Sequence, residues 1–398
     1  MPRSVKKVVL LFWPMAGYQY HVLRGIRRYA GAVADWQWEG MAPDAAAPAR
    51  LARQHPDGII GMVGTAQLAA AVRRLRVPAV DVSRWLAQPP GAQVAVDDRQ
   101  VGELAATYFL QRGFKHFAFV GSVVEWFAQE RQRGFISALR EAGCACPHMR
   151  VEDPEETLRK SAVWSRVNPA LGRWLTQWPQ PLAVFASADP VGLMVLATCR
   201  YYGLAVPQEV AVLGVDDDEL MSTLANPPLS SVQYPAERIG YEAAQLLHGL
   251  LARRPAPAAP LLLPPLGIIT RASTDRLAVA DPDVLKAARL IQAGVEAGDT
   301  IRIAPLAYKL AVSRRSLEMK FKKTLGHSIQ DEIRRAHLEV ARKLLADTDL
   351  KTLTVAARSG FANASRLCLM FKQHLGVTPS AYRQRFRVAG EGDSSPSR

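Results

Sequence analysis

The chain contains little cysteine and no long apolar run, and both absences limit what it can be. Four cysteines among 398 residues form no metal-ligand set, and the eight histidines show no H-x-x-x-H spacing, so we expect neither a metal site nor a cofactor. No stretch approaches the roughly 18 apolar residues of a membrane span. The VVLLFW run after Lys7 is too short for the apolar region of a signal peptide and is followed by Pro14. We therefore predict a cytoplasmic protein with no membrane partner.

Motifs of the common enzyme classes are missing as well. A dinucleotide-binding fold carries G-x-G-x-x-G after its first strand, but this chain reads LFWPMAGYQYH there. Neither a G-x-x-x-x-G-K-[ST] phosphate loop nor a G-x-S-x-G nucleophile elbow occurs. The acidic run at residues 216–218 lacks the companion acidic motifs of a Mg²⁺ site. The sequence therefore predicts no catalytic residues and no enzyme.

The C-terminal third carries an internal repeat with an offset of 50 residues. The repeated pairs are Ala307 and Ala357, Leu317 and Leu367, Phe321 and Phe371, Lys322 and Lys372, Leu325 and Leu375, and Gly326 and Gly376. Each copy predicts a helix-turn-helix with a buried Ala and a Leu/Phe core pair. Two such modules in tandem suit two successive major grooves of double-stranded DNA.

The second helix of each module is the one expected to read DNA. Ser313 and Asn363 are placed to cap these two helices. Leu317 and Phe321 stand four residues apart and face the core, so the residues between them point outward. The predicted DNA-contacting residues are Arg314, Arg315, Glu318, Met319 and Lys322 in the first module and Asn363, Ala364, Ser365, Arg366, Leu369 and Lys372 in the second.

Charge and a connecting helix support the same interpretation. Residues 281–388 hold 20 Lys and Arg against 10 Asp and Glu, a net of +10 out of +14 for the whole chain. Basic helices are often only solvated faces, so the tandem modules carry more weight than the charge. Between the modules, Ser328 and Asp331 resemble a capping box, and apolar residues at spacings of three and four predict one rigid helix.

The second module resembles a known family of DNA-binding domains. VAARSGFANASRLCLMFKQHLGVTPSAYR is similar to the pattern IA…GF…S.F….FK…G.TP..YR of the arabinose-operon-regulator (AraC) family, and the likeness extends from about Asp283 to Arg387. Leu367 departs from that pattern, because the family usually places an aromatic residue there. The resemblance implies a transcription regulator that contacts RNA polymerase and activates transcription.

The first 275 residues show a different pattern of apolar residues. Strand-length apolar runs alternate with helix-length amphipathic segments, which predicts parallel sheets covered by helices. The expected strands are VVLLF at 8, GIIGMV at 58, PAVDVS at 78, FAFVG at 117, LAVFAS at 182 and VAVLGV at 210, with helices from about Gln19, Gln67, Asp98, Ala128, Pro190 and Ala236. We predict a two-lobed α/β domain with its ligand site beyond the carboxyl ends of the strands.

Polar and aromatic side chains stand at those strand ends. This combination suits a sugar, because each hydroxyl both donates and accepts hydrogen bonds and the sugar ring has an apolar face. The candidate ligand residues are Tyr18, Arg84, Trp126, Arg131, Asp189, Asp216 and Gln233. Two of these have a structural alternative: Asp189 precedes Pro190 and could cap a helix, and Trp126 could lie in the core.

These segments also carry a resemblance. RQRGF, FASADPVGL, VAVLGVDD and LSSVQYPAERIGYEAAQLL look like the sugar-binding core of lactose-repressor and periplasmic ribose-binding proteins. In that family residues at the places of Arg131, Asp216 and Gln233 commonly contact the ligand, and Arg84 matches a further contact position. The fusion to an AraC-type domain is similar to bacterial xylose-operon regulators, which implies a homodimer and xylose or another pentose as effector. Residues 61–63 are Gly, Met and Val, where those regulators carry acidic residues.

The sequence thus predicts four segments. Residues 1–275 form the sugar-effector domain, 276–283 a linker, 284–388 the double helix-turn-helix domain and 389–398 a disordered tail. Sugar closing the cleft would favour one state of the effector domain and reposition paired DNA-binding domains on the nucleoid. The alternative is a sugar-processing α/β enzyme with an accessory nucleic-acid-binding domain.

Overall fold

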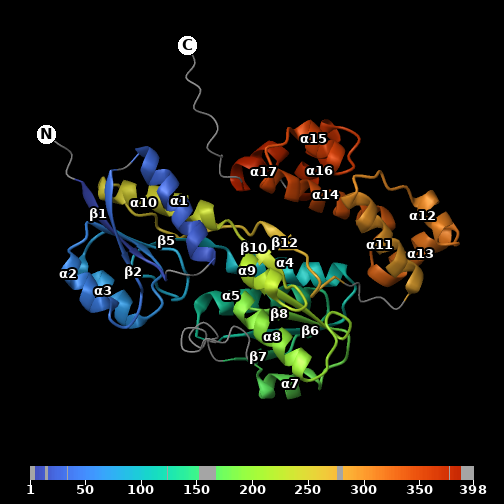
Figure 1. The fold of residues 1–398 in the computed structure, drawn as a ribbon, viewed down its shortest axis with the longest axis horizontal. Helices are drawn as coiled ribbons and strands as arrows, with labels where there is room; N and C mark the ends of the chain where they lie inside the picture. Colours follow the sequence, from blue (N-terminus) through green and yellow to red (C-terminus); the bar gives the residue numbers. More distant parts are fainter. Residues whose placement is uncertain are drawn as a thin grey trace, which may run out of the picture. The chain divides into compact units, whose positions relative to one another are not determined.

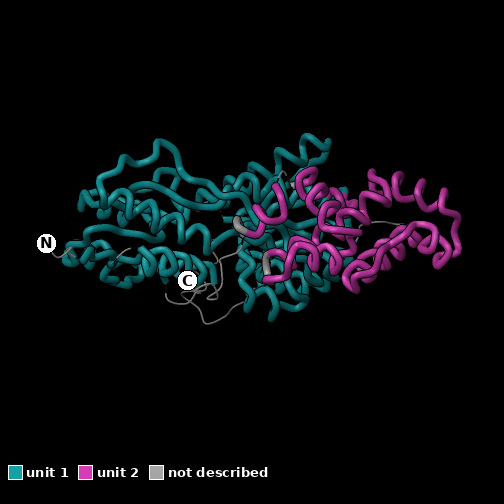
Figure 2. Tube along the Cα trace, turned by 90° about the horizontal axis from the view of Figure 1, so that it is seen from above, with its two compact units in different colours: residues 1–109, 115–276 teal, residues 110–114, 277–398 magenta. Residues whose placement is uncertain are grey.

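The computed structural model divides the chain into two compact units (Figure 1, Figure 2). It describes residues 5–13, 17–33, 35–122, 124–151, 167–275, 281–375 and 377–386. Unit 1 comprises residues 1–109 and 115–276, and unit 2 comprises residues 110–114 and 277–398. Of the predicted segments, the tail 389–398 and residues 276–280 of the linker lie outside the described residues, as does Gly376.

The first lobe of unit 1 is a parallel sheet in the order β11-β5-β4-β3-β1-β2. Its strands are β1 (Lys6–Leu11), β2 (Trp36–Met41), β3 (Gly58–Gly61), β4 (Ala79–Asp81), β5 (Ala92–Val96) and β11 (Leu261–Leu263). The helices α2 (Ala47–Gln54) and α3 (Ala66–Leu75) share a core with β1 and β3, while α10 (Ala236–Leu251) packs on β3, β4 and β5. Helix α1 (Gly17–Val33) packs so closely on α10 that a Cβ at Gly25 would lie 1.9 Å from the Glu237 carbonyl oxygen.

The second lobe has the order β12-β10-β9-β8-β6-β7. Its strands are β6 (His116–Gly121), β7 (His148–Arg150), β8 (Leu182–Ala186), β9 (Val210–Val215), β10 (Ser230–Gln233) and β12 (Gly267–Ile269). Its helices are α4 (Asp98–Gln111), α5 (Trp126–Glu141), α7 (Pro169–Leu175), α8 (Asp189–Tyr201) and α9 (Glu219–Leu224). All residues of β8 and β9 are buried, as expected for central strands covered on both faces.

The chain passes between the lobes three times: between β5 and α4, between β10 and α10, and between β11 and β12. These crossings bring the carboxyl ends of strands from both lobes to one junction. The predicted two-lobed α/β class is confirmed. One detail differs, because β12 pairs antiparallel with β10 and the second sheet is therefore not wholly parallel.

Unit 2 is helical. Its helices are α11 (Pro282–Glu296), α12 (Ile303–Lys309), α13 (Arg314–Leu325), α14 (Ile329–Asp347), α15 (Thr352–Arg358), α16 (Ala364–Leu375) and α17 (Pro379–Phe386). The first half of α14 shares a core with α11, α12 and α13, and its second half shares another with α15, α16 and α17. The capping box of Ser328 and Asp331 is present, so the predicted connecting helix is confirmed.

Candidate ligand site and nucleic-acid interface

A buried cluster lies where the strand ends of the two lobes meet, and Arg131 on α5 is at its centre. The Arg131 Nε donates to Asp98 Oδ1 at 2.9 Å, its Nη1 donates to the Ser187 carbonyl oxygen at 2.5 Å, and its Nη2 donates to the Tyr234 hydroxyl at 3.3 Å. The Asp216 carboxylate, directly after β9, has an oxygen 3.8 Å from Arg131 Nη1 and accepts a hydrogen bond from Tyr234. The structure thus brings together Arg131 and Asp216, as predicted.

Asp98 is a member of this cluster that the sequence analysis treats only as the start of a helix. It opens α4, and its side chain is 1% exposed. Burial raises the pKa of the Asp98 carboxyl, while the positive charges of Arg131 and Arg84 act in the opposite direction. The sequence signal for Asp98 is the acidic pair Asp97 and Asp98, which follows the strand β5 in the same way as residues 216–218 follow β9.

Arg84 approaches Asp98 from the first lobe without completing a hydrogen bond. The Arg84 Nε and Asp98 Oδ2 atoms are 3.6 Å apart, and both are buried without a hydrogen-bond partner among the described residues. Such orphaned polar atoms carry a desolvation penalty of about 1–3 kcal/mol each or more when charged. A hydroxyl group placed there would satisfy both, because it can accept from the guanidinium and donate to the carboxylate.

Aromatic rings line the same junction. The Tyr18 ring meets the Tyr234 ring edge to face with centroids 5.5 Å apart, and the Tyr18 hydroxyl donates to the Val82 carbonyl oxygen at 2.6 Å. The Arg131 guanidinium lies over Phe127, 4.6 Å from its centroid. Burial, chiefly, raises the pKa of the Tyr18 hydroxyl, which keeps it protonated as a donor.

Trp126 does not join this cluster. Its ring lies under the guanidinium of Arg133 on the same helix, with 4.8 Å from Arg133 Cζ to the ring centroid. The neighbouring Phe127 is the ring that lies beside Arg131. Successive residues on a helix point about 100° apart, so a motif that contains both rings does not reveal which one faces the junction.

Hydrogen bonds from backbone amides also join the two lobes beside the cluster. The Gly17 amide donates to Asp218 Oδ2 at 3.2 Å, and the amides of Trp126 and Phe127 donate to the carbonyl oxygens of Trp85 and Arg84, each at 3.0 Å. The described structure therefore has its lobes in direct contact at this junction. A Cβ at Gly17 would lie 2.5 Å from Asp218 Oδ2, so the first contact depends on glycine.

Asp189 lies beneath the loop after β9 and not in the cluster. It is fully buried: one carboxylate oxygen accepts from the Asp218 amide at 3.0 Å and the Ser222 hydroxyl at 3.1 Å, and the other accepts from the Ser231 hydroxyl at 2.6 Å. The predicted ligand contact by Asp189 is corrected accordingly, and its predicted alternative of a helix cap is not seen either, because α8 has no side-chain cap. Asp189 instead holds the loop that carries Asp216.

The residues of that loop adopt an unusual backbone. Asp216 has φ 119° and Asp217 has φ 52°, and Arg84 in the first lobe has φ 51°. Non-glycine residues in this region carry about 1–3 kcal/mol of strain each and cluster at functional sites. Gln233, the remaining candidate, has its amide nitrogen 3.1 Å from Asp217 Oδ2, so it reaches this loop and not Arg131.

The stability of unit 1 should depend on pH through Asp189. Burial, and to a lesser extent the charge of Asp217, raise the pKa of Asp189 from 3.8 to about 7. Between these values the folded state binds a proton that the unfolded state has released, so the free energy of unfolding should fall as pH rises from about 4 to 7, on the order of 4 kcal/mol in all.

The measurement is urea unfolding of the wild type and of Asp189→Asn at several pH values. Asn has the shape of the protonated acid and does not titrate. It should fit the site, because the Ser222 and Ser231 hydroxyls can accept as well as donate hydrogen bonds. The difference in unfolding free energy between the two proteins should therefore favour the variant increasingly towards pH 7. A difference that stays flat with pH would contradict the assignment.

The helices predicted to read DNA present the expected faces. In α13, Leu317 and Phe321 are fully buried, while Arg315, Met319 and Lys322 are exposed. Glu318 is half-buried and forms an ion pair of 2.9 Å with the exposed Arg314, so these two side chains engage each other.

The α16 helix repeats this arrangement. Its residues Leu367 and Phe371 are fully buried. The outward residues of this module are Asn363, Ser365, Arg366, Leu369 and Lys372, which are exposed, and Ala364, which is half-buried. The Asn363 side chain accepts from the Arg366 amide at 2.8 Å, as a helix cap. Contact of either face with DNA stays a prediction.

The repeat departs from its 50-residue offset in the first helix of each module. Ala307 is buried, but its expected counterpart Ala357 is exposed, and Ala356 is buried in its place. The backbone agrees, because Val312 N donates to the Ala307 carbonyl oxygen and Phe361 N donates to that of Ala356. The offset there is 49, since the turn of the second module is one residue longer.

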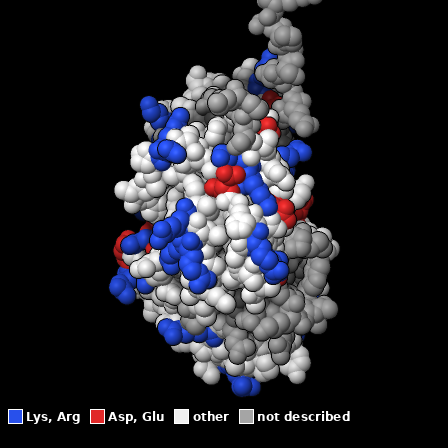
Figure 3. Space-filling model, turned by 90° about the vertical axis from the view of Figure 1, so that its left-hand side faces the viewer, with Lys and Arg blue, Asp and Glu red and all other residues white. Residues whose placement is uncertain are grey.

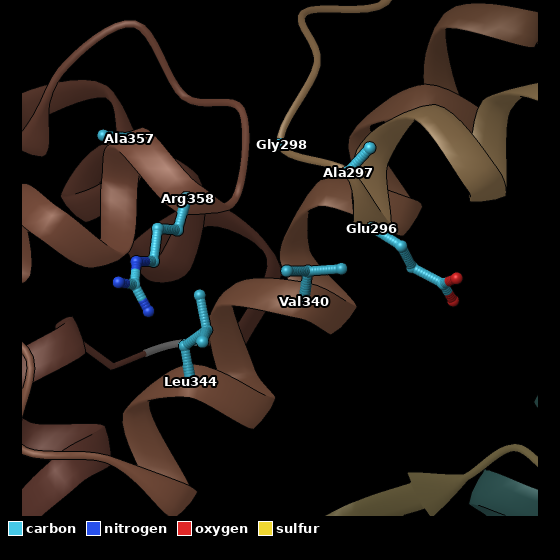
Figure 4. A pocket seen from close by; sticks show the side chains of 7 residues that line it. All are labelled: Glu296, Ala297, Gly298, Val340, Leu344, Ala357 and Arg358. Atoms are coloured by element: carbon cyan, nitrogen blue, oxygen red, sulfur yellow. The ribbon is translucent and has the colours of Figure 1, made fainter.

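A hollow of about 560 Å³ lies between the two modules along α14 (Figure 4). Val340 and Leu344 of α14 line it, and the Arg358 side chain extends towards Leu344. Glu296 and Arg358 at its sides are exposed, so this is an open groove between modules.

Unit 1 also has a basic surface. Figure 3 shows Lys and Arg outnumbering Asp and Glu on the face that looks out from the left of Figure 1, where α2 and α3 lie. Part of this charge is engaged locally: Arg50 pairs with Asp44 at 2.7 Å, and Arg73 donates to the carbonyl oxygens of Gln88 and Pro89. Basic charge by itself therefore does not locate a DNA interface in this chain.

Within the described part of the chain, no helix is long and apolar enough to cross a membrane. Among the same residues, no group of three or more His, Cys, Asp or Glu side chains could hold a metal ion.

Comparisons with known proteins match both units. A family model described as a periplasmic binding protein-like domain matches residues 106–274, and one described as a helix-turn-helix domain matches residues 306–385. The xylose operon regulatory protein of Escherichia coli (strain K12) is 29% identical over 387 residues, which cover 95% of this chain and 96% of that protein. Its namesake from Haemophilus influenzae is 27% identical over 392 residues, with 96% and 99% covered.

Solved structures agree with these matches. The structure of the xylose-binding transcription activator xylR is 28% identical, covers 96% of this chain and 99% of that chain, and has a TM-score of 0.58. A complex of the transcriptional regulator CelR with cellobiose, at 23% identity and a TM-score of 0.56, covers 67% of this chain and 84% of that chain and shows a shared fold. The similarity thus extends over both units.

Proposed function

We propose a function from the premise that this chain is an AraC-type regulator that carries a periplasmic-binding-protein-like domain and is homologous over its length to xylose operon regulatory proteins. On this proposal it is a DNA-binding transcription regulator, not an enzyme, and a sugar bound in unit 1 controls it. The observation that carries the sugar part is the pair of buried, unsatisfied atoms Arg84 Nε and Asp98 Oδ2 at the junction of the lobes.

The charges of the cluster favour an uncharged sugar. Two guanidinium groups, on Arg84 and Arg131, face two carboxylates, on Asp98 and Asp216. A sugar phosphate or sugar acid would add a buried charge without a partner, which is costly, whereas hydroxyl groups match both donors and acceptors. Tyr18 and Phe127 offer apolar ring surface beside them.

A pentose is the proposed effector, with xylose the first candidate because relatives are named for it. The end of β3 differs from the acidic pattern expected of xylose regulators. Met62 and Val63 are buried there, and the Val63 amide donates to the buried Asp81 at 3.2 Å. The acidic group at this edge therefore comes from β4.

Control of DNA binding follows from the two lobes. Tyr18 and Arg84 belong to the first lobe, and Arg131 and Asp216 belong to the second, so a sugar contacts both sets only when the lobes are closed. The sugar then favours the closed state by its differential affinity. In the proposed homodimer, closure repositions two double helix-turn-helix domains on neighbouring half-sites of duplex DNA, and RNA polymerase contact makes the protein an activator of sugar catabolic genes in the bacterial cytoplasm.

The proposed contact residues follow from this division. Those for sugar are Tyr18, Arg84, Arg131, Asp216 and, at the edge of the loop, Gln233; those for DNA are the outward residues of α13 and α16 named above. The proposed domain limits are 1–275 and 284–388.

A thermal-shift screen of the full chain against pentoses, hexoses, their phosphates and aldonic acids tests the proposal. An uncharged sugar at about 100 times its Kd should stabilise unit 1 by about 2.7 kcal/mol. Asp216→Asn should lose this shift, because Asn keeps the size of the Asp side chain but removes the charge that faces Arg131. The control is Asp44→Asn, a half-buried carboxylate on the first lobe that pairs with Arg50 away from the cluster.

The second readout is fluorescence anisotropy of a DNA duplex selected from a random pool by the full chain, at two salt concentrations. Binding should weaken steeply with salt, since phosphate contacts release counterions. A screen in which only phosphates or acids stabilise the protein would contradict the uncharged sugar. Absence of salt-dependent DNA binding would contradict the regulator itself.

A further inference from the structure

The last segment of unit 1 is fastened to the second lobe by buried hydrogen bonds. Residues 270–275 follow β12, and unit 2 begins its first helix at Pro282. The Ser273 hydroxyl donates to the Val212 carbonyl oxygen at 2.6 Å and accepts from the Ser230 amide at 2.8 Å. The Thr274 hydroxyl lies 2.6 Å from that of Tyr108 on α4. The chain therefore leaves unit 1 from a firmly held position on the second lobe.

Arg271, in the same segment, reaches the loop after β9. Its Nη2 forms an ion pair of 2.7 Å with Asp217 Oδ1, and its Nη1 donates to the Leu229 carbonyl oxygen at 2.9 Å. The two side chains are only 15% and 11% exposed. The second oxygen of Asp217 accepts from the Gln233 amide at 3.1 Å.

This pair stands between the candidate sugar site and the exit of the chain. Asp217 bonds to Gln233 and is the chain neighbour of Asp216. Its partner Arg271 lies four residues before the last described residue of unit 1. Asp217 has φ 52° and Asp216 has φ 119°. The backbone of this loop is also held independently of the ion pair, because the Asp217 amide donates to the Ser231 hydroxyl at 3.0 Å and the Asp218 amide donates to Asp189 at 3.0 Å. A buried ion pair adds little net stability over apolar side chains of similar volume, although the loss of one partner alone leaves a desolvated charge.

We propose that Asp217 and Arg271 are positioning residues that couple sugar occupancy at Asp216 and Gln233 to the segment leading into the DNA-binding unit. This rests on the proposed function. Among the described residues, no hydrogen bond or ion pair joins either side chain to Arg131, and Arg271 acts on the loop through Asp217. Breaking the pair uncouples DNA binding from sugar and leaves each binding step in place.

The test uses the full chain with Asp217→Asn, Arg271→Gln and the double variant. Asn accepts a positive φ, so the first variant removes charge without adding backbone strain. Sugar affinity is measured by calorimetry with xylose, or with whichever sugar stabilises the wild type. DNA affinity is measured by anisotropy, with and without that sugar, on the duplex selected by the wild type.

In the wild type, sugar should change DNA affinity by about tenfold, a typical allosteric coupling. In each variant this ratio should fall to within about twofold of one, while sugar affinity alone changes by no more than about threefold. Because coupling is reciprocal, DNA should also lose its effect on sugar affinity. The double variant should be no worse than either single variant, since both break one interaction. A purely structural role would not produce this pattern.

The matched control is Arg99→Gln, which breaks the exposed pair of Arg99 with Glu103 on α4 and should keep the wild-type ratio. Variants that keep a tenfold ratio would overturn the inference while leaving the proposed function intact. Variants that lose sugar binding together with thermal stability would overturn it too, because the pair would then only maintain the fold. A wild type that responds to no sugar would instead refute the proposed function.

Discussion

Arg131→Ala should lower the free energy of unfolding of unit 1 by about 3–5 kcal/mol and abolish the response to sugar. The substitution leaves Asp98 buried without its principal partner, and it removes donors to the Ser187 carbonyl oxygen and to Tyr234. Removing one member of a buried ion pair is far more damaging than removing both, because the remaining charge stays desolvated. The measurement is urea unfolding followed by calorimetric sugar titration under conditions in which the variant is folded.

The control for this prediction is Arg133→Ala on the same helix. Its guanidinium is exposed and pairs with Glu130, so its loss should change stability by no more than about 0.5 kcal/mol. The double variant Arg131→Met with Asp98→Asn separates two roles of the pair. It should recover much of the lost stability without recovering sugar binding. If Arg131→Ala and Arg133→Ala have the same free energy of unfolding, Arg131 is not central to the cluster.

Part of this site could be predicted because the ends of the strands follow from the sequence pattern. Asp216 follows a fully buried apolar run, and its location at the junction follows from parallel pairing. The acidic pair after β5 marks Asp98 as a candidate, but its partner depends on how α4 packs on α5. A Cβ at Gly102 would lie 2.1 Å from the Arg131 carbonyl oxygen, and only that close approach brings Asp98 to the guanidinium. Packing distances between helices are not encoded in local spacing.

The differences between the candidate residues and the contacts in the structure have similar physical causes. Trp126 and Phe127 differ by one residue on a helix, and the periodicity alone did not choose between them. Asp189 is a ligand candidate because it follows the apolar run of β8, yet the Ser222 and Ser231 hydroxyls, which come from elements later in the chain, donate to its oxygens. Such contacts form only when β9 and β10 are paired beside β8.

The helical unit was predicted more fully because its determinants are local. The buried positions of α13 and α16 repeat at helical spacing, and the caps at Ser313 and Asn363 are single side-chain contacts. The exception, Ala356 in place of Ala357, arises from one extra residue in a turn. A fixed offset assumes equal loop lengths, which core packing does not require.

Phe371→Ala should lower the free energy of unfolding of unit 2 by about 3–5 kcal/mol, because the ring is fully buried against Tyr382, with ring centroids 5.5 Å apart. Leu369 stands two residues earlier on α16 and is 45% exposed, so Leu369→Ala should cost no more than about 0.5 kcal/mol. Its effect should instead be on DNA: if this face lies in a major groove, Leu369→Ala weakens binding to the selected duplex by a factor that depends on the bases contacted.

The pair of variants thus tests both faces of one helix. Thermal unfolding of the full chain, in which unit 1 serves as an internal reference, gives the stability of unit 2, and anisotropy gives DNA affinity. Phe371→Ala should lose both, whereas Leu369→Ala should lose only affinity. If Leu369→Ala binds every duplex as the wild type does, α16 does not read DNA through this face. If Phe371→Ala leaves unfolding unchanged, the second module does not depend on the core that the repeat predicts.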